Sequence, residues 1–178
     1  MRDYIIMTDS CCDLSQQEVE ELELTVLPLS FTIEGKTLLN TPDHADMSPE
    51  EFFAKIAAGA DCTTAAVNVG QFTDAMEKVL QEGKDILCVC FSSALSTTYQ
   101  SACIAAEDLR EKYPEAKILV IDSLSASRGQ GMLLYRAVRE RREKNLTIDE
   151  LDAYVRSIIQ SPVSYTHLRA HETSAHLV

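Results

Sequence analysis

The sequence predicts an α/β fold, a three-layer α/β/α arrangement with a mainly parallel sheet. Short apolar, β-prone runs alternate along the chain with longer segments of helical periodicity, the pattern of strands that are connected by helices. The run 86–91 is apolar throughout, as expected of a strand that is buried on both faces. The chain has 178 residues, 46% of them hydrophobic, which is enough for one domain with a proper core.

The first half of the chain combines strands, a hairpin and helices. Segments 4–7 and 24–29 are apolar strands, and Pro28 restricts the second to an edge or to its own end. Gly35 separates two short β-prone segments, 30–33 and 37–39, and so predicts a hairpin. Helices are expected from Gln16 to Leu22 behind an Asp13 or Ser15 cap, from Pro49 to Gly59 behind Ser48, and from Gly70 to Gln81, with 62–69 as a connector.

The second half repeats strand and helix in alternation. Ser96 lies where a helix N-cap is expected, and Tyr99, Ala102, Cys103 and Ala106 follow on one helical face. The remaining expected elements are a strand at 117–121, a helix at about 129–144, and a last helix that Thr147 opens and that runs to about Ile159.

Three of the expected strands end in a turn that carries hydroxyl groups. These turns are Asp9-Ser10, Ser92-Ser93 and Asp122-Ser123. If the strands are parallel neighbours, the turns converge at the carboxyl edge of the sheet, where open α/β sheets bind ligands. Hydroxyls together with free N–H groups at a helix start favour an anion. The same residues would also serve as ordinary turn and cap residues.

Charge and composition exclude several function classes. The net charge is −12 and the pI is about 4.7, so nucleic-acid binding, which needs a basic face, is not expected, and anionic membranes are disfavoured. No stretch is long enough for stable membrane insertion, and the N-terminus lacks the pattern of a signal peptide. The six cysteines form no C-x-x-C pair, so we expect reduced thiols, a cytoplasmic location, no metal and no cofactor.

The segment 161–178 differs in character from the rest. It holds three of the four histidines, and a His-x3-His spacing would ordinarily suggest a metal site. However, Val163–Thr173, VSYTHLRAHET, resembles a translated transposase-type sequencing adapter over eleven consecutive residues. We therefore expect a genuine domain at 1–160, cut from a longer parent, and a non-native tail at 161–178 whose histidines carry no function.

Motifs along residues 1–159 resemble the N-terminal domain of a DegV-family fatty-acid-binding protein. The most specific motif is the serine-rich string from Ser92 to Ala102. Supporting motifs in order and spacing are Thr8-Asp9-Ser10, Asp13-Leu14, Pro28-Leu29, Thr63-Thr64 ahead of Phe72, Asp122-Ser123, and Ser127-x-Gly129-x-Gly131.

The resemblance implies a bacterial lipid carrier that binds a long-chain fatty acid between two α/β lobes and presents it to a fatty-acid kinase. It implies that Thr64 and Ser96 bind the carboxylate, and that the nearby residues are Ser92, Ser93, Thr63, Asp9 and Ser10. The second lobe is absent from this sequence, so an apolar face should remain exposed where the ligand tunnel would close.

Two departures from the family pattern fall inside the expected site. Ala65-Ala66-Val67-Asn68 stand where the family usually has Ser-Gln-Pro-Ser, and Thr97 stands where a glycine is usual. Because glycine allows a ligand to approach the backbone closely, Thr97 narrows access to the helix start.

The alternative function is a serine-dependent acyl or phosphoryl transfer enzyme. A serine nucleophile needs a positioned base. His44, on a polar loop, is the only histidine before the tail and is expected to be a solvated surface residue, while Asp9 and Asp122 are expected to organise hydrogen bonds at their strand ends. We therefore expect no catalytic residue and no enzyme activity.

Overall fold

Four parallel strands form the central sheet of the computed structural model, which describes residues 2–160; the predicted tail lies outside the described residues. Their order is β2-β1-β6-β7, and β6 is buried along its whole length, as predicted. The edge position of β2 agrees with Pro28, which follows it. The strands are β1 (Tyr4–Asp9), β2 (Leu24–Leu27), β6 (Asp85–Cys90) and β7 (Ile118–Asp122).

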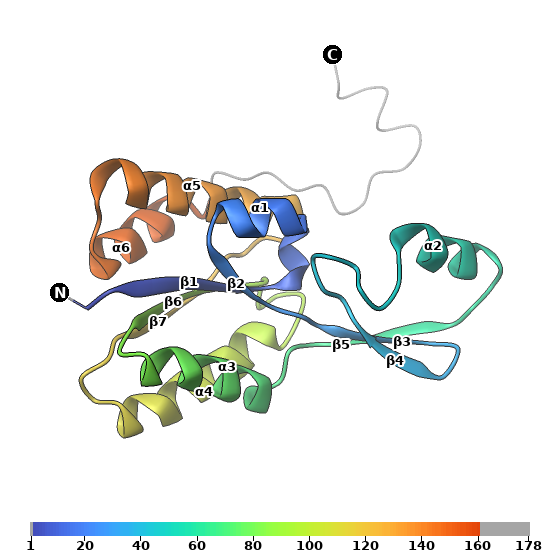
Figure 1. The fold of residues 1–178 in the computed structure, drawn as a ribbon, viewed down its shortest axis with the longest axis horizontal. Coiled ribbons are helices and arrows are strands. Elements are labelled where there is room, and N and C mark those ends of the chain that lie inside the picture. The colour runs from blue at the N-terminus through green and yellow to red at the C-terminus, as the bar shows by residue number, and fades with distance from the viewer. Residues whose placement is uncertain (1, 161–178) are drawn as a thin grey trace, which may run out of the picture.

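Helices cover both faces of this sheet, which confirms the three-layer prediction (Figure 1). One face packs against α1 (Gln16–Glu21), α5 (Arg128–Lys144) and α6 (Ile148–Ile158). The other face packs against α3 (Val69–Gln81) and α4 (Thr98–Lys112). Each interface has its own apolar core, because a strand buried on both faces sends alternate side chains to opposite sides.

A second, antiparallel sheet has the order β4-β3-β5, formed by β3 (Ser30–Ile33), β4 (Lys36–Leu39) and β5 (Cys62–Ala65). The predicted hairpin is confirmed: Glu34 and Gly35 both have positive φ, as a tight two-residue hairpin turn requires. The prediction of a connector at 62–69 was wrong for its first half. β5 is short and its threonines are exposed, so its strand character depends on pairing with β3 rather than on an apolar pattern.

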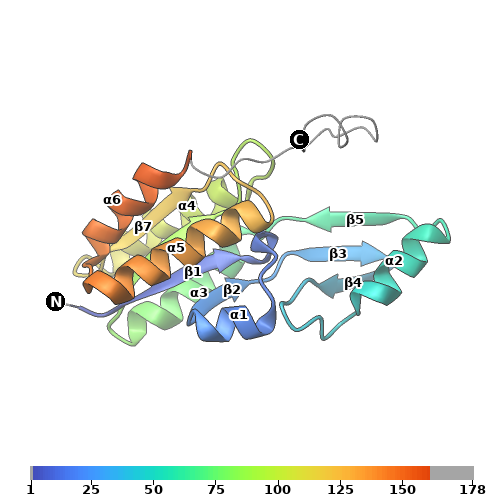
Figure 2. The ribbon, with the colours of Figure 1, turned by 90° about the horizontal axis from the view of Figure 1, so that it is seen from above.

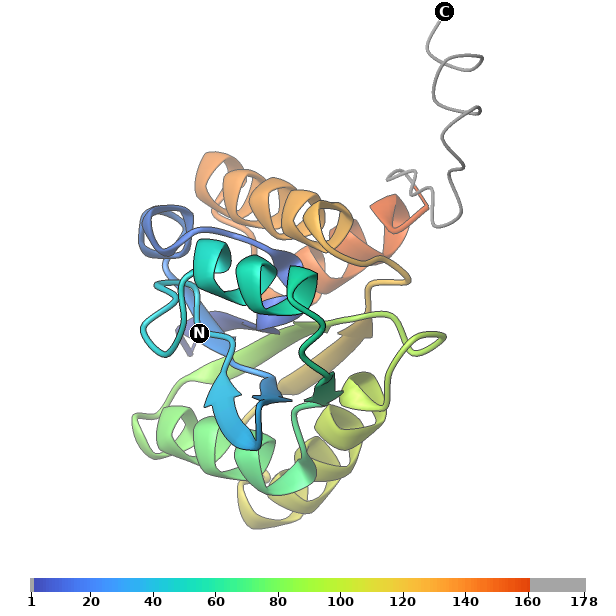
Figure 3. The same cartoon turned by 90° about the vertical axis from the view of Figure 1, so that its right-hand side faces the viewer.

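This second sheet and α2 (Pro49–Ala57) form an arm, residues 30–65, that extends past the carboxyl ends of the parallel strands (Figure 2). The chain enters the arm from β2 through Pro28-Leu29 and returns from β5 to α3. Phe52 of α2 meets Phe31 of β3 edge-to-face, with 5.5 Å between ring centroids. Figure 3 views the molecule from the side of the arm, with α2 in front.

Helix starts follow the predicted caps with one exception. Ser15, rather than Asp13, caps α1 and forms a capping box with Glu18, while Ser48 accepts a hydrogen bond from the Glu51 N–H. The prediction that Ser96 is the N-cap of α4 was wrong by one residue. Thr97 is the N-cap and makes no side-chain bond, whereas the Ser96 hydroxyl accepts from the Thr98 N–H at 3.2 Å.

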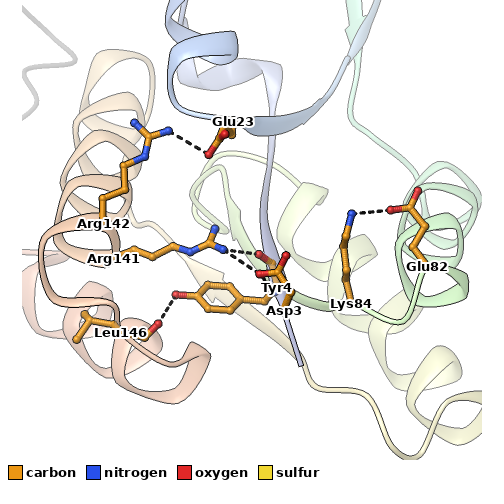
Figure 4. A network of polar contacts seen from close by, with 8 residues as sticks. All are labelled: Asp3, Tyr4, Glu23, Glu82, Lys84, Arg141, Arg142 and Leu146. Carbon is orange, nitrogen blue, oxygen red and sulfur yellow. Dashed lines mark hydrogen bonds and ion pairs between the residues drawn. The ribbon is translucent and has the colours of Figure 1, made fainter. Parts of the chain in front are cut away.

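The amino ends of the strands are fixed by a polar network that is remote from the arm (Figure 4). The Arg141 guanidinium of α5 donates to the Tyr4 carbonyl at 2.9 Å and lies 4.0 Å from the centroid of the Tyr4 ring. The Tyr4 hydroxyl donates to the Leu146 carbonyl at 2.8 Å. Burial raises the pKa of Tyr4, and the nearby Arg141 charge partly offsets this effect. Arg141 thus joins α5 to the first strand of the sheet.

We expect Arg141→Ala to lower the free energy of unfolding by about 1 kcal/mol, because the variant loses a charge-assisted hydrogen bond and a cation–π contact. Urea denaturation followed by circular dichroism measures this change. Lys84→Ala, which breaks only the exposed pair with Glu82, is the control and should leave the midpoint unchanged. Equal midpoints for both variants would contradict a structural role for Arg141.

Candidate functional site

The three hydroxyl-bearing turns converge, as predicted, because β1, β6 and β7 are parallel neighbours. Hydrogen bonds join the turns that follow β6 and β7. The Ser93 N–H donates to Asp122 Oδ1 at 3.1 Å, and the Ser92 N–H donates to the Ser125 carbonyl at 3.1 Å. Ser92 is buried and Ser93 is exposed, so the cluster has one side chain inside and one at the surface.

Asp9, the last residue of β1, organises this edge of the sheet through hydrogen bonds. Its carboxylate is fully buried and accepts hydrogen bonds from the Phe91 N–H at 2.7 Å, the Cys11 N–H at 3.1 Å and Gln130 Nε2 at 3.3 Å. Burial raises the pKa of Asp9, and these bonds offset only part of the effect. Asp122 similarly accepts from the N–H groups of Ser93 and Leu124. The prediction that both aspartates organise hydrogen bonds is therefore confirmed.

Gln130 also belongs to this network, although the sequence did not predict a role for it. It lies on α5, is fully buried, and donates through Nε2 to Thr8 Oγ1 at 2.9 Å as well as to Asp9. Thr8 in turn donates to the Val89 carbonyl at 2.7 Å. Its one sequence signal is its position between Gly129 and Gly131. Gly131 has no side chain and so allows α5 to lie close to the Cys12 carbonyl in the turn after β1.

The start of α4 lies beside this cluster. The Ser96 and Thr98 hydroxyls share a hydrogen bond of 2.9 Å. Ser96 is half-buried and Thr98 is buried. The Thr97 side chain does not cap the helix, and the Thr98 N–H is taken by the Ser96 hydroxyl. The N–H groups of Tyr99 and Gln100 therefore remain for an anion at this helix start.

A separate apolar groove of about 390 Å³ lies between the arm sheet, α2 and the loop before it. Thr64 is one of its few polar lining groups. Thr63 lies on the opposite face of β5, where it pairs with Thr32, because neighbouring strand residues point to opposite faces. The lining residues are Asp13, Leu29, Phe31, Leu39, Asn40, His44, Met47, Pro49, Phe52, Phe53 and Thr64.

A smaller, more polar cavity of about 250 Å³ adjoins the groove and shares Asp13, Asn40 and His44 with it. Ser10 and Arg128 line this cavity. The Ser10 hydroxyl accepts hydrogen bonds from the Leu29 N–H at 3.0 Å and from Asn40 Nδ2 at 3.4 Å, so Ser10 joins the end of β1 to the base of the arm.

The predicted site residues therefore fall into two groups. Asp9, Ser92 and Ser93 belong to the strand-end network, with Ser96 at the adjoining helix start, whereas Thr64 and Ser10 line the two cavities at the arm. Within residues 2–160, no hydrogen bond joins Thr64 to Ser96. His44 is exposed, as expected, yet it lines both cavities, a position that its loop sequence did not indicate.

The described part of the chain holds no group of three side chains arranged to bind a metal ion. Of the helices formed by residues 2–160, none is both long and apolar enough to span a bilayer. The described cysteines are all free thiols, with Cys88 and Cys90 buried in the core below α4.

Several known proteins are similar to this chain in sequence. DegV domain-containing proteins of Clostridium perfringens and Lactococcus lactis are 37% and 39% identical over 155 and 138 residues. These alignments cover 87% and 78% of this chain but 53% and 47% of the two relatives. The chain thus spans about half the length of the curated relatives it matches.

Solved structures share the fold. A stearic acid-binding protein from Eubacterium ventriosum has a TM-score of 0.77 at 26% identity, over 86% of this chain and 52% of its own. A fatty-acid-binding DegV family protein from Thermus thermophilus has a TM-score of 0.77 at 28% identity, over 90% of this chain and 54% of its own. These structural neighbours bind fatty acids.

The family comparison confirms the resemblance seen in the motifs. A family model described as "uncharacterised protein, DegV family" matches residues 4–168, a range that includes the first residues of the segment 161–178. This match covers well over half of the chain. The chain belongs to the DegV family.

Proposed function

We propose that this chain is the carboxylate-binding half of a carrier that binds a long-chain fatty acid and presents it to a partner such as a fatty-acid kinase. The acyl chain lies against the apolar wall of the arm, and Ser/Thr hydroxyls hold the carboxylate. The carrier works in the cytoplasm, where its free thiols stay reduced.

The observation that carries this proposal is the apolar groove with Thr64 in its wall. Phe31, Phe52 and Phe53 supply aromatic surface, and Thr64 supplies a hydroxyl group at the sheet side. A fatty acid needs both features, a long apolar slot and a few polar groups that fix its orientation. Each methylene group that the groove buries contributes about 0.8 kcal/mol, so the acyl chain dominates the affinity.

The carboxylate is assigned to two sources of donors. Thr64 donates from the arm, and Ser96 donates from the start of α4 together with the N–H groups of Tyr99 and Gln100. Ser92 and Ser93 shape the turn before that helix. Asp9 and Ser10 act as positioning residues, because both already accept hydrogen bonds from the backbone that surrounds them. Thr63 lies on the opposite face of β5 from Thr64, so we assign it no contact with the ligand.

The hydrogen bonds of the serine side chains support a carrier rather than an enzyme. Ser96 shares its hydrogen bond with Thr98 rather than with a base, and the Asp9 oxygens accept from backbone N–H groups and from Gln130. His44, the only histidine before the tail, lies on the arm loop. A serine nucleophile would need a base within hydrogen-bond reach, so we favour the carrier over the transfer enzyme.

The test is native mass spectrometry of the chain incubated with stearic acid. We expect the unmodified chain to bind stearic acid. Thr64→Val should lower the affinity about tenfold, since the variant loses one hydrogen bond to a charged group. Thr63→Val is a matched control: it makes the same change one residue away on the opposite face, and should leave binding unchanged.

Ser96→Ala should weaken binding in the same way as Thr64→Val. If the unmodified chain takes up no stearic acid, the proposal fails. Equal losses in Thr63→Val and Thr64→Val would overturn the assignment of the carboxylate to the groove face.

A further inference from the structure

We infer that His44 is a further ligand-binding residue, whose imidazolium charge attracts the fatty-acid carboxylate and makes its binding depend on pH. This inference rests on the proposed function and adds a cationic contact to it. His44 lines the same groove as Thr64, and it also lines the polar cavity that adjoins the groove. Among the side chains that line the groove, it is the one able to carry a positive charge.

The loop that carries His44 is held by local hydrogen bonds. The His44 N–H donates to the Thr41 carbonyl at 3.0 Å, and the Leu39 N–H donates to Asp46 Oδ2 at 2.6 Å. The following Ala45 N–H donates to Asp43 Oδ1 at 3.3 Å. These bonds fix the backbone on both sides of His44, so its ring is presented from a defined turn.

The backbone of His44 is in the left-handed region, with φ +53°. This conformation is uncommon for residues other than glycine and costs about 1 kcal/mol, although histidine, asparagine and aspartate adopt it more often than most. Glycine would adopt this backbone conformation without strain. The presence of histidine at the edge of a cavity is therefore consistent with a functional constraint on the side chain.

The charged groups around His44 come from its own loop, the 3-10 turn after β1, α5 and α1. Asp43 and Asp46 lie on its own loop. Hydrogen bonds with Thr41 and with the Ala45 N–H lower the pKa of Asp43, and the nearby His44 adds a smaller contribution in the same direction. Asp13, at the end of the 3-10 turn after β1, lines both cavities. Arg128 of α5 lines the polar cavity, and Glu18 of α1 neutralises it through two contacts of 2.7 and 2.9 Å. Among the ion pairs formed within residues 2–160, Arg128 is paired with Glu18, whereas His44 is in none.

The direction of the pH effect follows from these charges. Histidine is the side chain that changes charge between about pH 5 and 8, whereas a carboxylate stays ionised over that range. Protonation of His44 therefore adds an attraction for the ligand, and deprotonation leaves Asp13 and Asp43 to repel it. Binding should be tighter at the acidic end of the range, and added salt should reduce the difference because His44 is exposed.

The experiment measures the affinity of the 178-residue chain for cis-parinaric acid, by fluorescence titration at about pH 6 and at about pH 8. We expect the affinity to be about threefold higher at the lower pH, as suits an exposed charge pair. His44→Asn keeps a residue that tolerates the left-handed backbone and should bind equally at both pH values. His44→Lys restores the charge and should bind tightly at both.

Parinaryl alcohol, which has no carboxylate, serves as the uncharged probe and should show no pH dependence with any of these proteins. A pH profile of His44→Asn that matches the unmodified chain would overturn the inference while leaving the proposed function intact. An equal pH effect for the alcohol would also overturn it. Failure of the unmodified chain to bind either probe would instead remove the proposed function itself.

Discussion

Asp9→Ala is expected to lower the free energy of unfolding by about 3 to 5 kcal/mol, because it leaves several buried donors without an acceptor. The donors are the Phe91 N–H, the Cys11 N–H and Gln130 Nε2, which come from three different elements. The loss should also disorder the turn after β6, and with it the start of α4. Chemical denaturation gives the stability, and hydrogen exchange at Phe91 and the residues that follow reports on the turn.

Asp108→Ala is the matched control, since Asp108 is an exposed aspartate on α4, and it should leave stability unchanged. If Asp9→Ala proves as stable as this control, the carboxylate does not organise the strand ends. Protection of the Phe91 amide that survives the substitution would lead to the same conclusion.

Asp9→Asn separates the charge from the hydrogen bonds. Burial raises the folded-state pKa of Asp9 above its unfolded value of about 3.9, so the folded state prefers the neutral acid. The stability that Asp9 contributes by titration is complete below the unfolded pKa and is lost as the pH rises through the folded pKa. The advantage of the unmodified chain over Asp9→Asn should therefore be larger at about pH 4 than at about pH 7. A difference that is constant over this range would argue against a raised pKa.

Gly131→Ala is expected to lower the free energy of unfolding by about 2 kcal/mol, whereas glycine to alanine within an unobstructed helix stabilises it by about 1 kcal/mol. A methyl group at this position would lie 2.8 Å from the Cys12 carbonyl oxygen and 3.0 Å from Leu14 Cδ2. The carbonyl belongs to the backbone, so it cannot turn aside as a flexible side chain can. Thermal and urea denaturation should therefore give the opposite sign to the one that helix propensity predicts.

Met132→Ala provides the comparison, because Met132 follows on the same helix and is 54% exposed. It should change stability by less than about 0.5 kcal/mol. Stabilisation by Gly131→Ala would show that α5 does not approach the turn after β1 as closely as the structure indicates.

The central sheet could be predicted from the sequence because its signals are local. The run 86–91 is apolar enough to indicate a doubly buried strand, and the Ser15, Ser48 and Thr147 caps satisfy their own helix starts within three residues. The convergence of the strand ends followed from a topological rule rather than from any single residue. That rule placed Asp9 and Asp122 correctly.

The arm was harder to predict because its signals are not local. β5 exists through its register with β3, about thirty residues earlier in the chain, and its exposed threonines give no apolar alternation. Without that strand, the sequence could not show that Thr63 and Thr64 face opposite ways. The groove itself combines Leu29, Phe52 and Thr64, which only the folded arm brings together.

The way in which the arm joins the main sheet bears on how this family can diversify. Its first and last strands, β3 and β5, are hydrogen-bonded neighbours, so the chain leaves the core and returns to it at adjacent points. The arm is therefore a self-closed insertion: residues between Leu29 and Ala66 can lengthen, shorten or be exchanged as a cassette while the parallel sheet keeps its register. Variation confined to this cassette would reshape the apolar groove, and a chimera that carries a foreign cassette would test whether the groove sets the lipid preference that we propose.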